Sequence, residues 1–301
     1  MQPTALVLEG GGLRAMYTAG VLDAFLEAEL HFPYVVGVSA GAIYPASYLS
    51  RQHGRNLTIQ QRYLADKRYM GWRHWLKNGN YVNVDFTYRR MANELVPFDF
   101  ATFMASDSEF DVGAFNCQTG TTDFFGKADF HDSQRLLDIL IASSSLPFVS
   151  PMVEIAEQMY LDGGIAAPIP LAQAKQRGYH KQLMILTQDA AYRKSAFKAK
   201  WLANRVYRRY PKVAEALLVR HQQYNQALQQ LAAQVAAGDS LVIQPQAPLG
   251  LDRLERNVAK VAAVYQLGLS DGRAALPRVR EFIGGQTSRA ATDANAELAL
   301  A

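Results

Sequence analysis

Two strand patterns near the start of the chain are each followed at once by small residues and then by a helical pattern. The first, Thr4–Leu8, leads into Gly10-Gly11-Gly12, and the second, Tyr34–Val38, leads through Ser39 into an apolar segment over residues 41–49. Apolar strands that alternate with helices are typical of a parallel sheet that is buried on both faces. Sheets of this kind bind ligands at the carboxyl ends of their strands. We therefore expect both small-residue turns to lie at a functional edge.

Later patterns extend this α/β core, and after about residue 190 they indicate mainly long helices. Further strands are predicted at residues 110–116 and 121–125, as a hairpin, and at 152–161, 182–187 and 240–244. Helices are predicted at residues 136–145, 168–178, 195–210, 212–237, 251–267 and 270–283. We expect a three-layer α/β fold with a mostly parallel central sheet covered by helices. Its predicted parts are an α/β domain over residues 1–190, a mainly helical extension over 191–285 and a disordered tail over 286–301.

The sequence Gly37-Val38-Ser39-Ala40-Gly41 has the form G-x-S-x-G and lies between a strand pattern and a helix pattern. This context is typical of a nucleophile elbow, a sharp turn that exposes a serine hydroxyl at the end of a strand and requires very small residues on either side. The N-terminus of the following helix also favours negative charge at the serine. Alone, such a sequence is often a plain glycine turn. In this context it favours Ser39 as a nucleophile, supported by Gly37 and Gly41.

The glycine run Gly10-Gly11-Gly12 offers backbone N–H groups that no side chain shields. Such a turn can bind an anion, and in a serine hydrolase it would stabilise the oxyanion, with Arg14 adding positive potential or holding the loop. A dinucleotide site is the competing interpretation, because the spacing of Gly10, Gly12 and Ala15 fits G-x-G-x-x-G/A. That interpretation is disfavoured because no acidic residue follows at the end of the second strand, where it would bind ribose.

A serine nucleophile needs a base. The histidines after Ser39 lie at no convincing junction of strand and loop; they are His53, His74, His131, His180 and His221. Asp162 is the better candidate, since it ends a strand pattern and is followed by Gly163 and Gly164, which allow a tight turn toward the edge that carries Ser39. Partial burial would raise the basicity of its carboxylate. By itself, Asp-Gly-Gly would more often be a surface turn.

Three motifs, Gly10-Gly11-Gly12-Leu13-Arg14, Gly37-Val38-Ser39-Ala40-Gly41 and Asp162-Gly163-Gly164, occur in this order over the first 165 residues. The ordered set resembles the patatin-like phospholipases, in particular their bacterial single-chain members. The segment 142–147 also resembles the one that this family places before its aspartate. The resemblance covers residues 4–190. It implies a Ser39–Asp162 dyad without histidine, an oxyanion hole at residues 10–12, no metal or other cofactor, and a lipid or phospholipid ester as substrate.

The sequence departs from the family pattern at two positions. Ala15 replaces a glycine that many members carry after the arginine, and Pro168 replaces the asparagine of D-G-G-x-x-x-N-x-P. Neither position belongs to the dyad, so the first hypothesis remains a serine acyl hydrolase that works through an acyl-enzyme. One alternative is a lipid-binding or regulatory module of low activity on the same fold. The other is a histidine-dependent esterase of the α/β-hydrolase type, using His180 or His221.

Positive charge is concentrated in Arg193–His221, which carries nine Lys or Arg against one acid, Glu215, whereas the whole chain carries +4. Aromatic residues such as Phe197 and Trp201 are interleaved with these charges. A solvated helix face is the favoured interpretation, peripheral contact with an anionic membrane is the second, and nucleic-acid binding is not expected. The aromatic segment Tyr69–Trp75 is expected to pack in the core rather than to form a lid.

Composition limits the remaining possibilities. With 49% apolar and 19% charged residues, the chain has enough apolar side chains for a large core. No apolar stretch is long enough to span a bilayer, and the first residues do not resemble a secretory signal. The single cysteine, Cys117, cannot form an internal disulfide. We therefore expect a cytoplasmic protein. An alternative is that it also binds peripherally to the inner membrane surface.

Overall fold

A computed structural model describes residues 3–284 and contains an eight-stranded sheet. The strand order is β5-β6-β3-β2-β1-β7-β8, with β4 paired to β3. The strands are β1 (Thr4–Leu8), β2 (Tyr34–Val38), β3 (Glu109–Asn116), β4 (Thr122–Phe125), β5 (Val153–Ile155), β6 (Gln158–Asp162), β7 (Lys181–Ile185) and β8 (Ser240–Ile243). The pairs from β3 through β2, β1 and β7 to β8 are parallel, and those that involve β4, β5 and β6 are antiparallel. The prediction of a mostly parallel sheet is confirmed.

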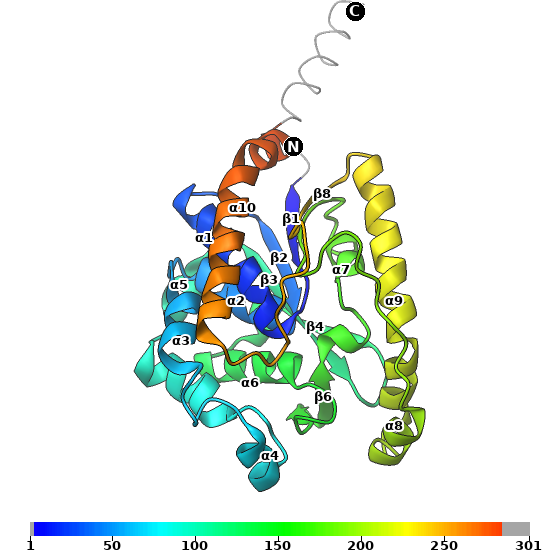
Figure 1. Cartoon of the computed structure of the whole chain (residues 1–301). Helices are drawn as coiled ribbons and strands as arrows, with labels where there is room; N and C mark the ends of the chain where they lie inside the picture. The colour runs from blue at the N-terminus through cyan, green and yellow to red at the C-terminus, as the bar shows by residue number, and fades with distance from the viewer. Residues whose placement is uncertain (1–2, 285–301) are drawn as a thin grey trace, which may run out of the picture.

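Helices cover both faces of the sheet (Figure 1). Side chains of β1 alternate: Leu6 and Leu8 pack with α1, α2 and α10, whereas Ala5 and Val7 pack with α7 and α9. The longer helices are α1 (Met16–Glu27), α2 (Ala40–Leu49), α3 (Arg55–Tyr63), α6 (Ser133–Ser144), α9 (Pro211–Ala236) and α10 (Val258–Gly284). The shorter ones are α4 (Trp72–Asn78), α5 (Phe100–Ala105), α7 (Leu171–Gln176), α8 (Lys200–Val206), the π-helix η2 (Asp85–Leu95) and the 3-10 turns η1 (Gly12–Ala15), η3 (Lys127–Asp129) and η4 (Gly163–Ile165).

The strand predicted over residues 152–161 is instead a hairpin of two short strands, β5 and β6. Ala156 and Glu157 connect them, and both have left-handed backbone conformations, with φ of 50° and 63°. A two-residue turn with two positive φ angles matches the twist of an antiparallel hairpin. The sequence there carries no glycine or asparagine, so the turn could not be predicted from residue type.

The two helices predicted at 251–267 and 270–283 are one continuous helix, α10. We expected a break near Gly268, but this glycine lies where α10 crosses α1, and a Cβ there would overlap the carbonyl of Tyr17. The hydroxyl groups of Tyr17 and Tyr265 join the same two helices through Asp271 and Asp23. The small residue therefore permits close helix packing rather than a turn.

The helix predicted over residues 195–210 is also shorter, because α8 begins only at Lys200. The side chain of Asn225 on α9 accepts from the Lys194 backbone N–H at 2.9 Å and donates to the Lys194 carbonyl at 3.2 Å. These two hydrogen bonds hold the segment before α8 in a non-helical conformation. The predicted helix at residues 212–237 and the strand at 240–244 are present as α9 and β8. The domain boundary at residue 190 stays a prediction, and the predicted tail, 286–301, lies outside the described residues.

Candidate active site

Ser39 lies in a strained turn between β2 and α2. Its φ of 57° and ψ of −132° are outside the regions that most residues with a side chain adopt. A Cβ on Gly37 would overlap the carbonyl of Gly41, and a Cβ on Gly41 would lie only 2.6 Å from the Glu9 carbonyl oxygen, so both flanking positions must be glycine for this turn to close. The side chain of Ser143 on α6 holds the strained backbone, since its Oγ accepts from the Ser39 N–H at 2.9 Å and donates to the Gly113 carbonyl at 2.7 Å.

The glycine run after β1 packs directly beside Ser39. A Cβ on Gly10 would lie only 3.0 Å from the Ser39 Cβ, so a larger residue would push the loop away. Within residues 3–284, no hydrogen bond engages the N–H groups of Gly10, Gly11 and Gly12. Leu13 N–H, the next in line, donates to the Arg253 carbonyl at 3.1 Å and anchors the loop to the segment before α10. Three amide donors are therefore available next to the serine.

Asp162 ends β6, which runs antiparallel to β3. Ala114 of β3 is level with Asp162, and the preceding Gly113 is level with Val38 of β2. Ser39 and Asp162 are thus nearly level and separated by one strand, a backbone distance of about 10 Å that two side chains can span. Asp162 is buried, and its Oδ1 accepts from Gly164 N–H at 2.8 Å. Gly163 packs against the Gly113 carbonyl, where no Cβ would fit.

One small polar pocket brings most of the predicted site residues together. Its lining includes Gly10, Gly11, Gly12, Arg14, Ser39, Asp162 and Gly164. Gly37, Gly41 and Gly163 do not line it and lie in the supporting backbone. None of the chain's histidines lines this pocket, and His221 Nδ1 is bonded to the Leu218 carbonyl.

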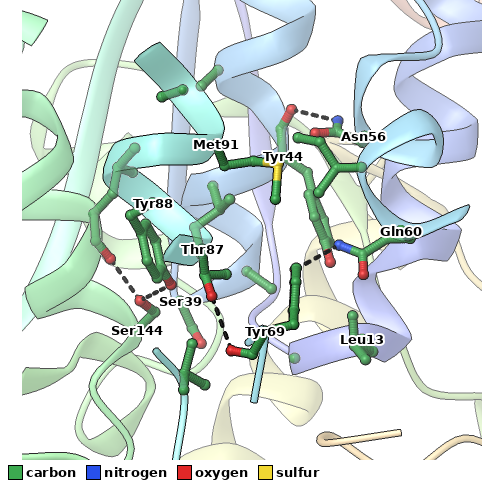
Figure 2. A pocket seen from close by; sticks show the side chains of 18 of the residues that line it. Leu13, Ser39, Tyr44, Asn56, Gln60, Tyr69, Thr87, Tyr88, Met91 and Ser144 are labelled. Atoms are coloured by element: carbon green, nitrogen blue, oxygen red, sulfur yellow. Dashed lines mark hydrogen bonds between the residues drawn. The ribbon is translucent and has the colours of Figure 1, made fainter. Parts of the chain in front are cut away.

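A second, apolar pocket of about 170 Å³ opens beside Ser39 (Figure 2). Most of its wall is aliphatic or aromatic and comes from α2, α3, η2 and α6. Two pairs of polar side chains in this wall bond to each other: Gln60 Nε2 donates to Tyr69 OH at 3.1 Å, and Tyr88 OH and Ser144 Oγ are 2.7 Å apart. Among the described residues, Gln60 Oε1 is buried without a hydrogen-bond partner. A cavity whose wall is mostly apolar suits a hydrocarbon chain.

Ser39 lies where the two pockets meet. It lines both of them, together with Gly12, Leu146 and Arg253. A ligand with an ester group at Ser39 can therefore place one end among apolar side chains and the other in the polar pocket. Across residues 3–284, no three His, Cys, Asp or Glu side chains are grouped so that they could hold a metal ion.

Comparison with known proteins assigns the family. The model of the patatin-like phospholipase family matches residues 6–175, more than half of the chain. The chain belongs to the patatin-like phospholipase family. A domain family of unknown function, DUF6363, matches residues 210–284 and thus covers α9, β8 and α10 of this patatin-like protein.

Relatives of the patatin-like chain include an uncharacterised Escherichia coli protein, YjjU, 31% identical over 61% of this chain and 51% of that protein. The lysophospholipase nte1 of Emericella nidulans is 30% identical over 58% of this chain and 11% of its own length. The chain thus spans about half or less of these curated relatives. Among solved structures, VipD from Legionella pneumophila aligns with a TM-score of 0.45 at 12% identity, covering 92% of this chain and 67% of VipD.

Sequence reasoning missed several residues of the patatin-like site. Lys194 and Arg220 belong to the basic segment that was expected to be a solvated face, yet both line the polar pocket, as does Arg253. Ser143 lies within the segment 142–147 that resembled the family, but its contact with the Ser39 N–H could not be inferred. The clustering of arginine and lysine with aromatic residues in 193–221 was the only sequence signal for Lys194 and Arg220. It did not indicate which of the basic side chains point toward the pocket.

Proposed function

We propose that this protein is a lipid acyl hydrolase that cleaves a carboxylic ester through an acyl-enzyme, with Ser39 as nucleophile and Asp162 as base. The observation that carries the proposal is the position of Ser39 between a polar pocket that also holds Asp162 and an apolar pocket of acyl-chain character. Membership in the patatin-like phospholipase family supports lipid acyl hydrolase activity, and the lysophospholipase relatives point the same way. No described histidine competes with Asp162 for the role of base in the polar pocket.

In the proposed reaction, Asp162 accepts the Ser39 hydroxyl proton as Oγ attacks the ester carbonyl carbon. The carbonyl oxygen becomes an oxyanion, which the free N–H groups of Gly10, Gly11 and Gly12 stabilise. The bond to the alcohol then breaks, and Asp162 returns its proton to the departing oxygen. Water attacks the acyl–Ser39 ester with the same proton transfers, and it releases a fatty acid and the free serine. The N-terminus of α2 adds a favourable field at Ser39.

Turnover of 4-nitrophenyl octanoate by the wild type, Ser39→Ala and Asp162→Asn tests this function, together with labelling by a fluorophosphonate. We expect the wild type to hydrolyse the ester and to be labelled, Ser39→Ala to lose both, and Asp162→Asn to be slower by roughly a hundredfold or more. A folded wild type no faster than Ser39→Ala would favour the lipid-binding module instead. Activity that survives Asp162→Asn but not His180→Ala or His221→Ala would favour the histidine-dependent esterase.

We also propose peripheral contact with an anionic membrane surface on the cytoplasmic side, through residues 193–221 and helix α4. Trp201 is 70% exposed on α8, beside the exposed Arg205, and on α4 Trp72 and Leu76 are 62% and 78% exposed. The prediction that the aromatic segment 69–75 packs in the core is therefore confirmed for Tyr69 and wrong for Trp72 and Trp75. Exposed tryptophan and leucine among basic residues are typical of helices that bind a membrane interface.

The two exposed helices are joined at Phe148, close to the site. Trp75 Nε1 on α4 donates to the Phe148 carbonyl at 3.1 Å, and the ring of Phe197, just before α8, stacks on the Phe148 ring with 5.8 Å between centroids. Leu146, two residues earlier, lines both pockets. Figure 1 shows α4 and α8 at the end of the molecule opposite the N-terminus. Within residues 3–284, no helix is long and apolar enough to cross a bilayer, so the proposed contact is with the surface.

A further inference from the structure

Four basic side chains converge on the polar pocket from separate parts of the chain. Arg14 comes from η1, Lys194 from the segment after β7, Arg220 from α9, and Arg253 from the loop before α10. The last three lie outside residues 6–175, which the patatin-like model matches. The surroundings of the site are therefore completed by segments that the family match does not include.

The two carboxylates of the pocket, Glu9 and Asp162, offset only part of this positive charge. Glu9 Oε2 accepts from Thr187 N–H at 2.6 Å and Oε1 accepts from Tyr224 OH at 2.7 Å, while Asp162 Oδ1 is bound to Gly164 N–H. Four cations thus face two carboxylates, so positive charge predominates in the pocket.

Three of the cations have no polar partner for their side chains. Across residues 3–284, the side chains of Arg14 and Arg253 make no hydrogen bond or ion pair, and Arg14 Nε is buried without an acceptor. The Lys194 ammonium contacts only a ring, 5.7 Å from the Tyr224 centroid.

Bringing the four cations together costs free energy through their mutual repulsion and their loss of hydration. Burial and the positive charges of Arg220, Arg253 and Arg14 lower the pKa of Lys194 to about 7. Burial and the charge of Arg253 also lower the pKa of Arg14. Half-buried like charges repel one another and lose hydration, and both costs fall when an anion binds among them. Donors that converge without acceptors are thus arranged for an external acceptor.

We propose that Arg14, Lys194, Arg220 and Arg253 form a subsite for a phosphoryl group in the alcohol part of the substrate. The inference rests on the proposed ester hydrolysis at Ser39 and specifies its substrate as an acyl ester that carries a phosphate near the scissile bond. Guanidinium groups match phosphoryl oxygens in geometry and charge. All four cations line the polar pocket and Ser39 lines both pockets, so the phosphate lies across Ser39 from an acyl chain in the apolar pocket. The polar pocket as a whole has a volume of about 20 Å³, enough for one or two oxygen atoms.

Binding to the Ser39→Ala protein tests the subsite without requiring turnover. The ligands are 1-oleoyl lysophosphatidylglycerol and 1-oleoylglycerol, which share the same acyl ester but differ in the phosphate, both as monomers in solution. We expect the phosphate-bearing lipid to bind at least about tenfold more tightly. Adding Arg253→Gln or Lys194→Gln should remove most of this preference, whereas Arg62→Gln, an exposed arginine on α3, should keep it.

The two single variants separate a binding role from a folding role. The backbone carbonyl of Arg253, not its side chain, anchors Leu13, so Arg253→Gln leaves that contact in place. Equal affinity for the two lipids, or a preference that survives both substitutions, would overturn the proposal. Inorganic phosphate that binds as tightly as the lysolipid would likewise overturn it, in favour of a site for the free ion. If the preference is present in a protein that hydrolyses no ester, the subsite stands and the proposed catalysis fails.

Discussion

Arg220 Nε donates a hydrogen bond to the carbonyl oxygen of Gly164, over a distance of 2.6 Å. Gly164 in turn donates its N–H to Asp162 Oδ1 at 2.8 Å, so helix α9 holds the turn that orients the candidate base. A Cβ on Gly164 would lie 3.0 Å from Asp162 Oδ1 and 3.3 Å from Arg220 Nη2, which shows how closely the three residues approach. Helix α9 in the C-terminal region therefore contributes directly to the candidate site.

Arg220→Gln should lower kcat for a neutral nitrophenyl ester roughly tenfold, because the Asp162 turn loses a charge-assisted hydrogen bond. KM should change less, since that ester carries no phosphate for the cation to bind. Arg220→Lys should recover part of kcat through a donor at the same carbonyl, and Arg62→Gln serves as the control. A kcat for Arg220→Gln equal to that of the wild type would contradict the positioning role.

Ser143→Ala should destabilise the protein by about 1–3 kcal/mol, because a buried Ser39 N–H and the Gly113 carbonyl both lose their partner. Urea unfolding measures the change. Ser145→Ala is the matched control, since the Oγ of that buried serine bonds only to the Ile141 carbonyl of its own helix. We also expect Ser143→Ala, but not Ser145→Ala, to reduce fluorophosphonate labelling of Ser39. Equal losses in the two variants would show that the Ser143 bridge has no special role.

Met91→Phe should shift ester preference toward shorter acyl chains, because Met91 is buried in the wall of the apolar pocket and a larger ring fills part of its space. The ratio of kcat/KM for nitrophenyl dodecanoate to that for nitrophenyl butyrate measures the shift, and we expect it to fall several-fold. Met104→Phe is the control, at a half-buried methionine that does not line the pocket. An unchanged ratio would mean that the acyl chain binds elsewhere.

Trp72→Ala and Trp201→Ala should each weaken binding to vesicles that contain phosphatidylglycerol, by roughly tenfold, because each removes a large exposed apolar group. Binding should also fall with added salt, since surface charges are screened. Sedimentation with vesicles measures both effects. Val235→Ala, at the far end of α9, removes another exposed apolar side chain and should have no effect. Vesicle binding that depends equally on Val235 would point to non-specific adhesion.

Affinity for a phosphodiester lysolipid should fall as pH rises from 6 to 8, because the pKa of Lys194 is about 7 and its charge is lost over this range. The lysophosphatidylglycerol phosphate keeps one negative charge throughout, so the ligand does not titrate. Because a bound anion favours the protonated lysine, affinity for the anion is higher at low pH. We expect a decrease of about threefold to tenfold in the Ser39→Ala protein, and a flat profile after adding Lys194→Gln. The groups that face Lys194 are Glu9, Arg14, Tyr224, Arg220 and Arg253.

The free energy of unfolding should depend on pH in the opposite direction from the ligand affinity. The pKa of Lys194 is lower in the folded state than its ordinary value, so protonation favours unfolding. Stability should therefore rise as pH increases above about 7, and Lys194→Gln should remove that part of the dependence. Thermal unfolding at several pH values, compared between the wild type and Lys194→Gln, measures it.

The sequence by itself determined those strands and helices that depend on residues within them or directly beside them. Apolar strand patterns with glycine behind them predicted β1 and β2, and Pro211 with Gly238 predicted the bounds of α9. The three glycine motifs also identified seven of the sixteen residues that line the polar pocket, because a close backbone approach requires glycine at a particular place in the chain. Ser39, Asp162 and the run 10–12 were therefore found without coordinates, while their catalytic roles remain a proposal.

Only the tertiary structure decided how distant segments meet. Asp162 reaches the level of Ser39 because β3 extends beyond β2 and pairs with β6 in the antiparallel direction, a register that no local pattern specifies. The inward positions of Lys194 and Arg220 depend on how α9 packs on the sheet, and the continuity of α10 depends on its crossing with α1. In each case the deciding interaction joins residues far apart in the chain, so the free energy that favours it exists only once both partners are packed together.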